Sequence, residues 1–554
     1  MLNRPHPKLL SRVAPLVAPL LFWGALGTAA AQNVPNAGQL LEESRRNPPA
    51  LPAQPPQRLV EPPQRPSISM AAGVTVQVSE FRISGATSFP VDELAAVLKP
   101  WAGRRLDFKG LNEAAAALTR HYQARGHLLS YAYLPAQKVA DGVIEIAVLE
   151  GRLENVQVVT AQDVRLRDSV IQHGTDPLIG SVPLLQRDVE RRLLLLNDIP
   201  GVTARAAFTP GATTGGAEMV VTVAEDEPLD FRADFSNHGS KSTGIYRMGV
   251  TLQFKDLLGL GDHTTARGIV SDRGSLVSGS LGTTVPVGGD GWKFGGSLSR
   301  LRYQLAGDFR RLGATGQADT FGLDASYPLR RTPDNSVYLR AGTDLKRLQD
   351  DVEVLGESHP KRNQTAEVGL GYELRDGWAG AATGSATVTL GKLRVDNGPE
   401  REWRKLLVQW ARQQSLPGAF SAYTRFAGQV TGTTLDSSEK LGLGGANAVR
   451  AYGAGELSVD QGSLVSLELR YAMDFTGGNV VGSLFHDVGR GQISRALTGL
   501  PGNQREIHGS GLGLSWTGSG YGLSASLAWR GSSPSTTGGG DQRPRLFVQF
   551  LLNP

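Results

Sequence analysis

In YRMGVTLQFK, residues 246–255, apolar and polar side chains alternate strictly. A second stretch, YGLSASLAWR at residues 521–530, has the same period of two. A strand with this period presents one apolar face and one polar face. Each apolar stripe covers nine residues and has an aromatic residue at both ends, which is typical of a tilted strand that crosses a bilayer. We therefore expect membrane-spanning strands.

Such strands are expected throughout residues 229–554. This part holds 53 of the 69 glycines, and glycine disfavours helix. Because lipid offers no hydrogen-bonding partner to a free strand edge, the sheet must close into a barrel. At roughly 20 residues per strand and connection, the segment gives about 16 antiparallel strands. A large soluble β-sandwich would also alternate, but it would leave the aromatic ends and the charge-free apolar stripes unexplained.

The amino-terminal part is organised differently. Residues 1–31 combine a basic start, an apolar core and small residues before Gln32, which predicts a secretory signal peptide. Within residues 32–47, the segment 36–46 can form three helical turns. Eight prolines lie between Pro48 and Pro66, so residues 48–72 are expected to form an extended linker or spacer.

Two consecutive units follow, residues 73–151 and 152–228, and both are predicted to have the order β-α-α-β-β. In the first unit we expect an initial strand at 76–83. In the second we expect a first helix near 164–171. A repeat of this kind is typical of a modular binding surface.

Composition excludes several kinds of site. The chain has no cysteine, so disulfides, thiol catalysis and thiolate metal sites are excluded. A net charge of +5 over 554 residues, without a dense Lys/Arg block, gives no support for nucleic-acid binding. The zinc pair H-E-x-x-H, the G-x-S-x-G elbow and the phosphate-binding P-loop are missing. We therefore expect no enzyme, cofactor or metal site, and we expect carboxylate pairs such as Asp350-Asp351 to lie in solvated turns.

Two short segments within the predicted barrel are unusual. One is GGANAVRAY at residues 444–452, which carries a single arginine, Arg450, among small residues. The other is FHDVG at residues 485–489, late in a predicted strand. From the residues alone, the favoured interpretation is that Arg450 is an ordinary loop charge and Asp487 an ordinary residue facing the barrel interior.

Three runs in the first unit resemble a known domain. They are SGATSFPVDELAAVL, YQARGHLLSYAYLP and DGVIEIAVLEGRLE, which begin at Ser84, Tyr122 and Asp141, and they resemble the first POTRA domain of two-partner secretion transporters (TpsB proteins). GGANAVRAY and the later ELRY resemble the segment around the V-R-G-Y loop tip of that family. FHDVG resembles its F-x-D-x-G strand motif.

The resemblance implies a fold and a site. The fold is an N-terminal plug helix, a linker, two α+β POTRA domains and an all-β barrel of 16 strands. The implied site is a loop tip inside the barrel that faces a motif on the inner wall, with an ion pair between Arg450 and Asp487. Carried over by motif, the tip consists of Val449, Arg450, Ala451 and Tyr452, and the wall motif of Phe485, Asp487 and Gly489.

Two departures from the family pattern lead to further expectations. Ala451 stands where the family has glycine, so a positive φ at this position would strain the backbone. The sequence ends FLLNP rather than on an aromatic residue, so Phe547 or Phe550 is expected to supply the signal that the barrel-assembly machinery reads.

The resemblance also implies a function. The protein would lie in the bacterial outer membrane, in contact with its lipid, with its POTRA domains in the periplasm. It would bind a large unfolded exoprotein of the adhesin or haemolysin type at those domains and export it without nucleotide energy, and residues 36–46 would occupy the pore at rest. The alternatives are a passive porin and a barrel-assembly insertase.

Overall fold

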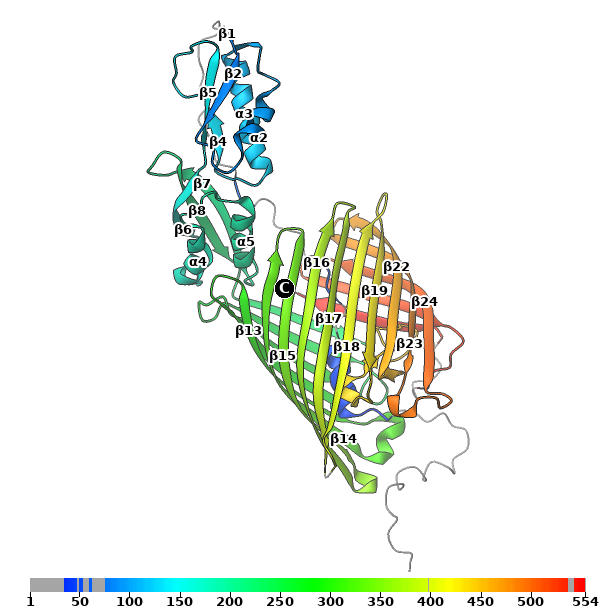
Figure 1. The fold of residues 1–554 in the computed structure, drawn as a ribbon. Helices are drawn as coiled ribbons and strands as arrows, with labels where there is room; N and C mark the ends of the chain where they lie inside the picture. Colours follow the sequence, from blue (N-terminus) through cyan, green and yellow to red (C-terminus); the bar gives the residue numbers. More distant parts are fainter. Residues whose placement is uncertain are drawn as a thin grey trace, which may run out of the picture.

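The computed structural model describes residues 34–46, 49–52, 59–61, 75–396, 398–536 and 543–553. The predicted signal peptide, residues 1–31, and most of the segment 48–72 lie outside this range. Two small α/β units precede a closed barrel; the second adjoins one rim of the barrel, and the first lies beyond the second (Figure 1). Among the described residues, no helix is both long and apolar enough to span a membrane.

Sixteen antiparallel strands close the barrel, which confirms the expected architecture. The first strand, β9, pairs with β10 on one side and with the last strand, β26, on the other. The barrel strands are β9 (Leu229–Ser236), β10 (Arg247–Lys255), β11 (His263–Ser271), β12 (Leu276–Val287), β13 (Trp292–Gln304), β14 (Ala314–Arg331), β15 (Asn335–Val352), β16 (Glu357–Asp376), β17 (Gly380–Val395), β18 (Arg401–Ser415), β19 (Phe420–Thr431), β22 (Gln461–Phe475), β23 (Gly478–Gln492), β24 (Gln504–Thr517), β25 (Tyr521–Arg530) and β26 (Arg545–Leu552).

The two faces of the barrel wall follow the predicted alternation. At the start of β10, Met248 and the preceding residue Tyr246 are more than half exposed, whereas Arg247 pairs with a residue inside the pore. Ring pairs lie at both ends of the wall. Phe235 stacks on Tyr246 where β9 meets β10 at the rim away from the small units, and further pairs lie at the opposite rim. These further pairs are Trp292–Tyr327, Phe420–Tyr471 and Trp516–Tyr521. The arrangement corresponds to two aromatic girdles at the membrane surfaces.

Short 3-10 turns shape several connections at the rim away from the small units. Because the strands run alternately up and down from β9, each of these connections follows an upward strand. The turns are η2 (Asp272–Gly274), η3 (Gly307–Leu312), η4 (Glu353–Leu355) and η6 (Arg495–Leu497).

The first unit contains the sheet β2-β5-β4 covered by two helices. The expected strand 76–83 is divided, because the backbone of Val78 pairs with 103–104 and that of Ser79 with Gly142. A separate two-stranded sheet, β1-β3, results. The elements are β1 (Thr75–Gln77), β2 (Glu80–Ser84), α2 (Val91–Leu98), β3 (Arg105–Asp107), α3 (Phe108–Ala124), β4 (Tyr131–Tyr133) and β5 (Val143–Leu149).

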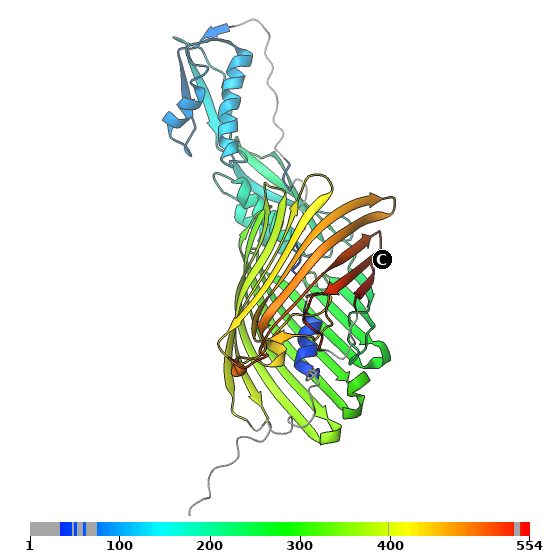
Figure 2. The ribbon, with the colours of Figure 1, turned by 90° about the vertical axis from the view of Figure 1, so that its right-hand side faces the viewer.

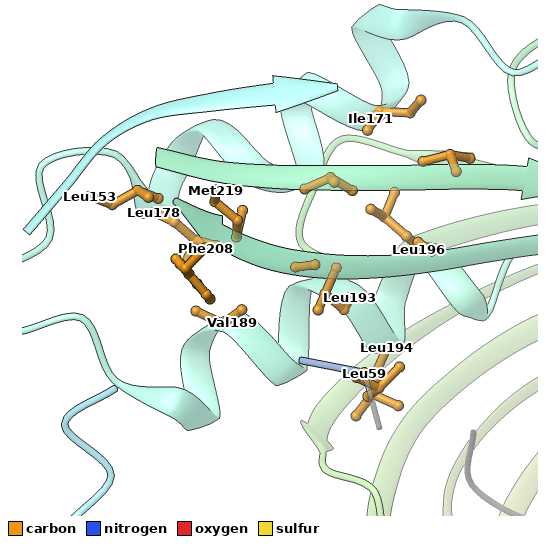
Figure 3. Close-up of a cluster of buried hydrophobic side chains, with 14 of the residues drawn as sticks. Leu59, Leu153, Ile171, Leu178, Val189, Leu193, Leu194, Leu196, Phe208 and Met219 are labelled. Carbon is orange, nitrogen blue, oxygen red and sulfur yellow. The ribbon is translucent and has the colours of Figure 1, made fainter. Parts of the chain in front are cut away.

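The second unit has the sheet order β6-β8-β7, with its helices packed on one buried cluster (Figure 3). The short helix predicted near 164–171 is present, but it begins four residues later, at Asp168. The Glu225 carboxylate accepts the backbone N–H groups of Arg165 and Leu166 at 2.9 and 3.1 Å and holds them outside the helix. The elements are β6 (Arg152–Thr160), α4 (Asp168–Thr175), η1 (Asp176–Leu178), α5 (Gln186–Asn197), β7 (Val202–Pro210) and β8 (Gly216–Glu225).

Direct contacts join the two units to each other and to the barrel. Leu128 N–H donates to the Leu184 carbonyl at 3.1 Å, and the side chain of Leu129 lies in the buried cluster of the second unit. On the barrel side, Arg331 binds both carboxylate oxygens of Asp198, at 2.9 and 2.7 Å. Because two parallel hydrogen bonds join the guanidinium to the carboxylate, the contact fixes the orientation of the second unit at the barrel as well as its distance.

His127 is buried at the junction between the units. Its backbone forms a bridge with Leu185, and its ring lies 5.3 Å from that of Tyr122. Burial lowers the pKa of His127; the Glu150 carboxylate opposes this effect and the Arg125 guanidinium adds to it. The folded state therefore favours the neutral imidazole.

We expect acid to loosen this junction. A histidine whose folded-state pKa is lowered stabilises the fold fully above its ordinary pKa of about 6.5, and the contribution is lost as the pH falls toward the lowered value. Hydrogen-exchange protection of the α3 amides, corrected for intrinsic rates, should fall from about pH 8 to about pH 5. His127→Leu should remove this dependence. An equal fall in both proteins would assign it to another group.

Candidate functional site

The connection between β19 and β22, residues 432–460, folds into the barrel; we call it the lumen loop. It contains η5 (Ser437–Glu439), β20 (Leu441–Gly442) and β21 (Ser458–Val459). Its apolar side chains form a buried cluster with Phe485 and Ile507 of the barrel wall. The loop members of this cluster are Leu441, Leu443, Ala448, Val449, Ala451, Tyr452, Leu457 and Val459. The loop therefore has a small apolar core of its own within the pore.

Arg450, at the tip of the lumen loop, makes three hydrogen bonds to Asp487 on β23. Its Nε and Nη2 atoms donate to the two carboxylate oxygens at 2.8 Å each, and its backbone N–H donates at 3.1 Å. Asp487 is fully buried. The guanidinium also covers the ring of Phe485, with Cζ 3.4 Å from the ring centre. The structure thus brings together Arg450, Asp487 and Phe485 in one compact contact.

A second carboxylate, Glu468 on β22, also holds Arg450. The Glu468 Oε1 atom lies 2.7 Å from Arg450 Nη1, and its other oxygen lies 2.7 Å from Arg470 Nη2. Sequence reasoning did not assign this residue a role. The sequence did contain a signal for a role in the pore, because Glu468 belongs to the polar face of β22 and to the ELRY segment.

Small residues make room for the tip. A Cβ atom at Gly489 would lie 3.1 Å from side-chain atoms of Leu443 and Val449, so glycine permits the loop to reach the wall. The Cβ of Ala451 fills the space left by Gly509, where a Cβ would lie 2.3 Å from it. The expected strain at Ala451 is not found, because its φ is not among the positive values of the described non-glycine residues. Tyr452, fully buried, donates its hydroxyl to the Ser533 carbonyl at 2.9 Å.

Four more carboxylates attach the lumen loop to its surroundings. Glu439 lies between two lysines, with Lys346 Nζ at 2.6 Å and Lys405 Nζ at 3.0 Å. All four are buried, and a buried charge is tolerated only when it is paired. Two further pairs with the wall are Asp436–Lys361 and Glu456–Arg505. The Asp460–Lys440 pair lies within the loop, and Asp460 reaches its surroundings by accepting the Arg495 backbone N–H at 2.7 Å.

A helix from the amino-terminal segment, α1 (Ala37–Arg45), lies inside the barrel beside η5 (Figure 2). Leu40 and Leu41 are buried against an apolar patch on the inner wall. This wall patch consists of Leu276, Leu301, Tyr303, Leu305, Ala314, Ala318 and Leu348. The inner wall of a channel barrel is ordinarily polar, so an apolar patch there matches the apolar side of α1.

Polar contacts near both ends of α1 also attach the helix to the barrel wall. Asp350 accepts the Ala37 N–H and the Tyr303 hydroxyl, both at 2.7 Å. The expectation that Asp350 lies in a solvated turn was therefore wrong, because this carboxylate faces the pore from β15 and receives the start of the helix. Glu43 pairs with Arg247 at 2.9 Å toward the other end.

Gly38 sets how closely α1 approaches the lumen loop. A Cβ at this position would lie 2.3 Å from Ser437 Oγ and 2.7 Å from the backbone nitrogen of Ser438. Gln39 Nε2 donates to the Gly455 carbonyl at 3.4 Å in the same interface. Helix and loop therefore pack directly against each other inside the barrel.

We expect the Arg450–Asp487 pair to hold the tip as a single unit. Because removing one member leaves a buried charge, Arg450→Ala and Asp487→Ala should each cost about 3 kcal/mol of local stability, more than a solvated pair would. Hydrogen exchange of the amides at 443–453 should accelerate accordingly, and the double variant should be no worse than either single one. Glu402→Ala, at an exposed pair with Lys392, is the matched control. Additive effects of the two variants would contradict direct coupling.

Comparisons with known proteins agree with this architecture. The family model described as haemolysin secretion/activation protein ShlB/FhaC/HecB matches residues 215–516, and the ShlB-type POTRA domain model matches residues 76–151. The heme/hemopexin transporter protein HuxB of Haemophilus influenzae (strain 86-028NP) is 26% identical over 454 residues, 79% of this chain and 80% of its own. The outer membrane transporter CdiB of Escherichia coli is 26% identical over 451 residues, 78% of this chain and 75% of its own.

Among solved structures, CdiB from Escherichia coli has the same fold, with a TM-score of 0.69 at 23% identity over 88% of this chain and 93% of that one. The first family model covers more than half of the chain, and its range includes the lumen loop, Arg450 and Asp487. The protein therefore belongs to the haemolysin secretion/activation (ShlB/FhaC/HecB) family of two-partner secretion transporters, with its barrel in the outer membrane and its POTRA region in the periplasm.

Proposed function

We propose that the protein exports one large, unfolded exoprotein of the adhesin or haemolysin type through its barrel. The observation that carries this proposal is the content of the pore. A helix and a loop of the same chain lie in it, and both are attached by side-chain contacts that can be broken without breaking the wall. A conduit for a polypeptide needs such removable parts, because it must be closed when no substrate is present.

The proposal assigns a role to each segment. A signal peptide (1–31) directs the chain to the periplasm, and the barrel-assembly machinery inserts residues 229–554 into outer-membrane lipid. The plug segment (32–47) and linker (48–72) control the pore. The two POTRA units, 73–151 and 152–228, receive the partner, whose extended segments pair with the edges of their sheets by main-chain hydrogen bonds.

Export without nucleotide follows from the compartment. The periplasm supplies no nucleotide, so a chain that folds outside the cell would be prevented from sliding back, and folding itself would drive the net movement. In this scheme the protein acts as a conduit rather than an enzyme, and it needs no cofactor.

The two alternatives make different demands. A passive porin has no use for the two α/β units or for a pore filled by α1. A barrel-assembly insertase shares the general architecture, but the family match is to the secretion proteins.

Deleting the gene should remove one large protein from the culture supernatant or the cell surface and leave the other outer-membrane proteins at normal levels. Supernatant and surface fractions of the two strains would be compared by mass spectrometry. An unchanged supernatant would favour the porin, and a general loss of outer-membrane proteins would favour the insertase.

We expect α1 to close the pore. Deleting residues 36–46 should raise single-channel conductance in planar bilayers. Gly38→Val should do the same without removing the helix, because the added side chain cannot fit against Ser437 and Ser438. Glu42→Ala, which affects only an ion pair within the segment, is the control. Unchanged conductance in the deletion variant would refute the plug assignment.

A further inference from the structure

The proline-rich linker is not a free spacer, because residues Leu59–Glu61 are bound to the second unit. They lie beside β7, the edge strand of its sheet. Ala206 N–H donates to the Leu59 carbonyl at 3.0 Å, and Glu61 N–H donates to the Ala206 carbonyl at 2.9 Å. Val60 and Ala206 form a parallel bridge. The linker therefore adds a very short strand to the sheet.

The side chain of Leu59 strengthens this attachment. Leu59 lies in the same buried cluster as Val189, Leu193 and Leu194 of α5 (Figure 3). The linker thus uses the two components of strand-addition binding, main-chain hydrogen bonds along an edge and an apolar side chain in a pocket.

The available edge of β7 is longer than the linker can use. Edge-facing backbone groups recur every second residue, at Ala204, Ala206 and Phe208. At Ala204, the side-chain amide of Asn197 donates to the backbone carbonyl at 2.9 Å and accepts the backbone N–H at 3.1 Å. Another strand therefore cannot pair with the edge at this residue. If the parallel pairing continued past Glu61, the backbone N–H of residue 63 would have to donate to the Phe208 carbonyl. Residue 63 is a proline and has no N–H.

We propose that the β7 edge at Ala206 and Phe208 is the docking site for an extended segment of the exported partner, and that Leu59–Glu61 is a placeholder which the partner displaces. The expected ligand is a non-proline extended segment with a large aliphatic residue in the position of Leu59. Such a segment makes the same contacts as the linker and adds those to Phe208, so it outcompetes the linker. This inference rests on the proposed function and specifies where the partner is recognised.

Displacement of the placeholder also links recognition of the partner at β7 to release of α1 from the pore. The chain runs from Arg46, at the end of α1, to Leu59 in 13 residues, and from Arg46 to β1 at Thr75 in 29 residues. At roughly 3.5 Å per residue, release extends the maximum reach of the tether from about 45 Å to about 100 Å. Binding at β7 thereby gives α1 the slack to leave the barrel.

A synthetic peptide with the sequence of residues 56–65, in which Pro62 and Pro63 are replaced by alanine, tests the site directly. Its binding to the full-length protein in detergent would be measured by fluorescence anisotropy. Leu59→Asp and Glu61→Pro weaken the placeholder and should each tighten peptide binding at least tenfold, whereas Glu61→Ala, which keeps the N–H, should leave it near the wild-type value. The peptide that retains both prolines should bind more weakly than the alanine version.

Ala206→Pro tests the edge itself. Because both backbone groups of Ala206 face the linker, this change removes the edge donor while sparing the β7–β8 ladder, and peptide binding should be lost. Unchanged binding to Ala206→Pro, or no gain in Leu59→Asp, would overturn the proposal. The linker variants leave β7 itself unchanged and do not depend on how that strand tolerates proline.

In cells, Ala206→Pro should reduce secretion of the partner at least tenfold at equal levels of protein in the membrane, and Leu59→Asp should not reduce it. Normal secretion by Ala206→Pro would refute the β7 site while leaving the proposed export function intact. Failure of the export function itself would be recognised separately, since deleting the gene would then change no secreted protein.

Discussion

The structure depends on the need of a strand in lipid to pair every backbone group. That requirement closes the sheet between β9 and β26 and produces an interior large enough to contain other parts of the chain. An enclosed interior must be filled or left open to water. In this protein α1 and the lumen loop lie in it, and the properties of the site follow from how these two parts are attached.

Attachment combines two kinds of contact that differ in reversibility. The lumen loop is held by buried ion pairs such as Arg450–Asp487 and Glu439–Lys346, which are costly to break one at a time. The α1 helix relies more on apolar contact with the wall patch and on close approach at Gly38. The helix is also tethered to β7 through Leu59. The helix is therefore the part suited to leave, and the loop the part suited to stay until α1 has gone.

The sequence predicted the barrel because alternation in strands such as 246–255 is a local signal, and strand number follows from length. Arg450 and Asp487 required the family resemblance, since nothing local in GGANAVRAY indicates which wall residue it meets. The role of Glu468 could have been predicted from its place on the polar face of β22. The roles of Asp350 and Leu59 could not, because they depend on partners more than a hundred residues away in the sequence, Ala37 and Ala206. In addition, a proline-rich segment is normally predicted to be an extended spacer, so its composition gives no indication that one apolar residue, Leu59, is buried in the second unit.

Under the proposed function, the pore is closed by the protein's own chain and opens when a partner is exported. Since the natural sequence has no cysteine, one placed at Leu301, beneath α1 in the wall patch, reports on this directly. A charged, membrane-impermeant thiol reagent added to whole cells should leave that cysteine unmodified at rest and modify it while the partner is being secreted. Equal modification in the two states would contradict the account.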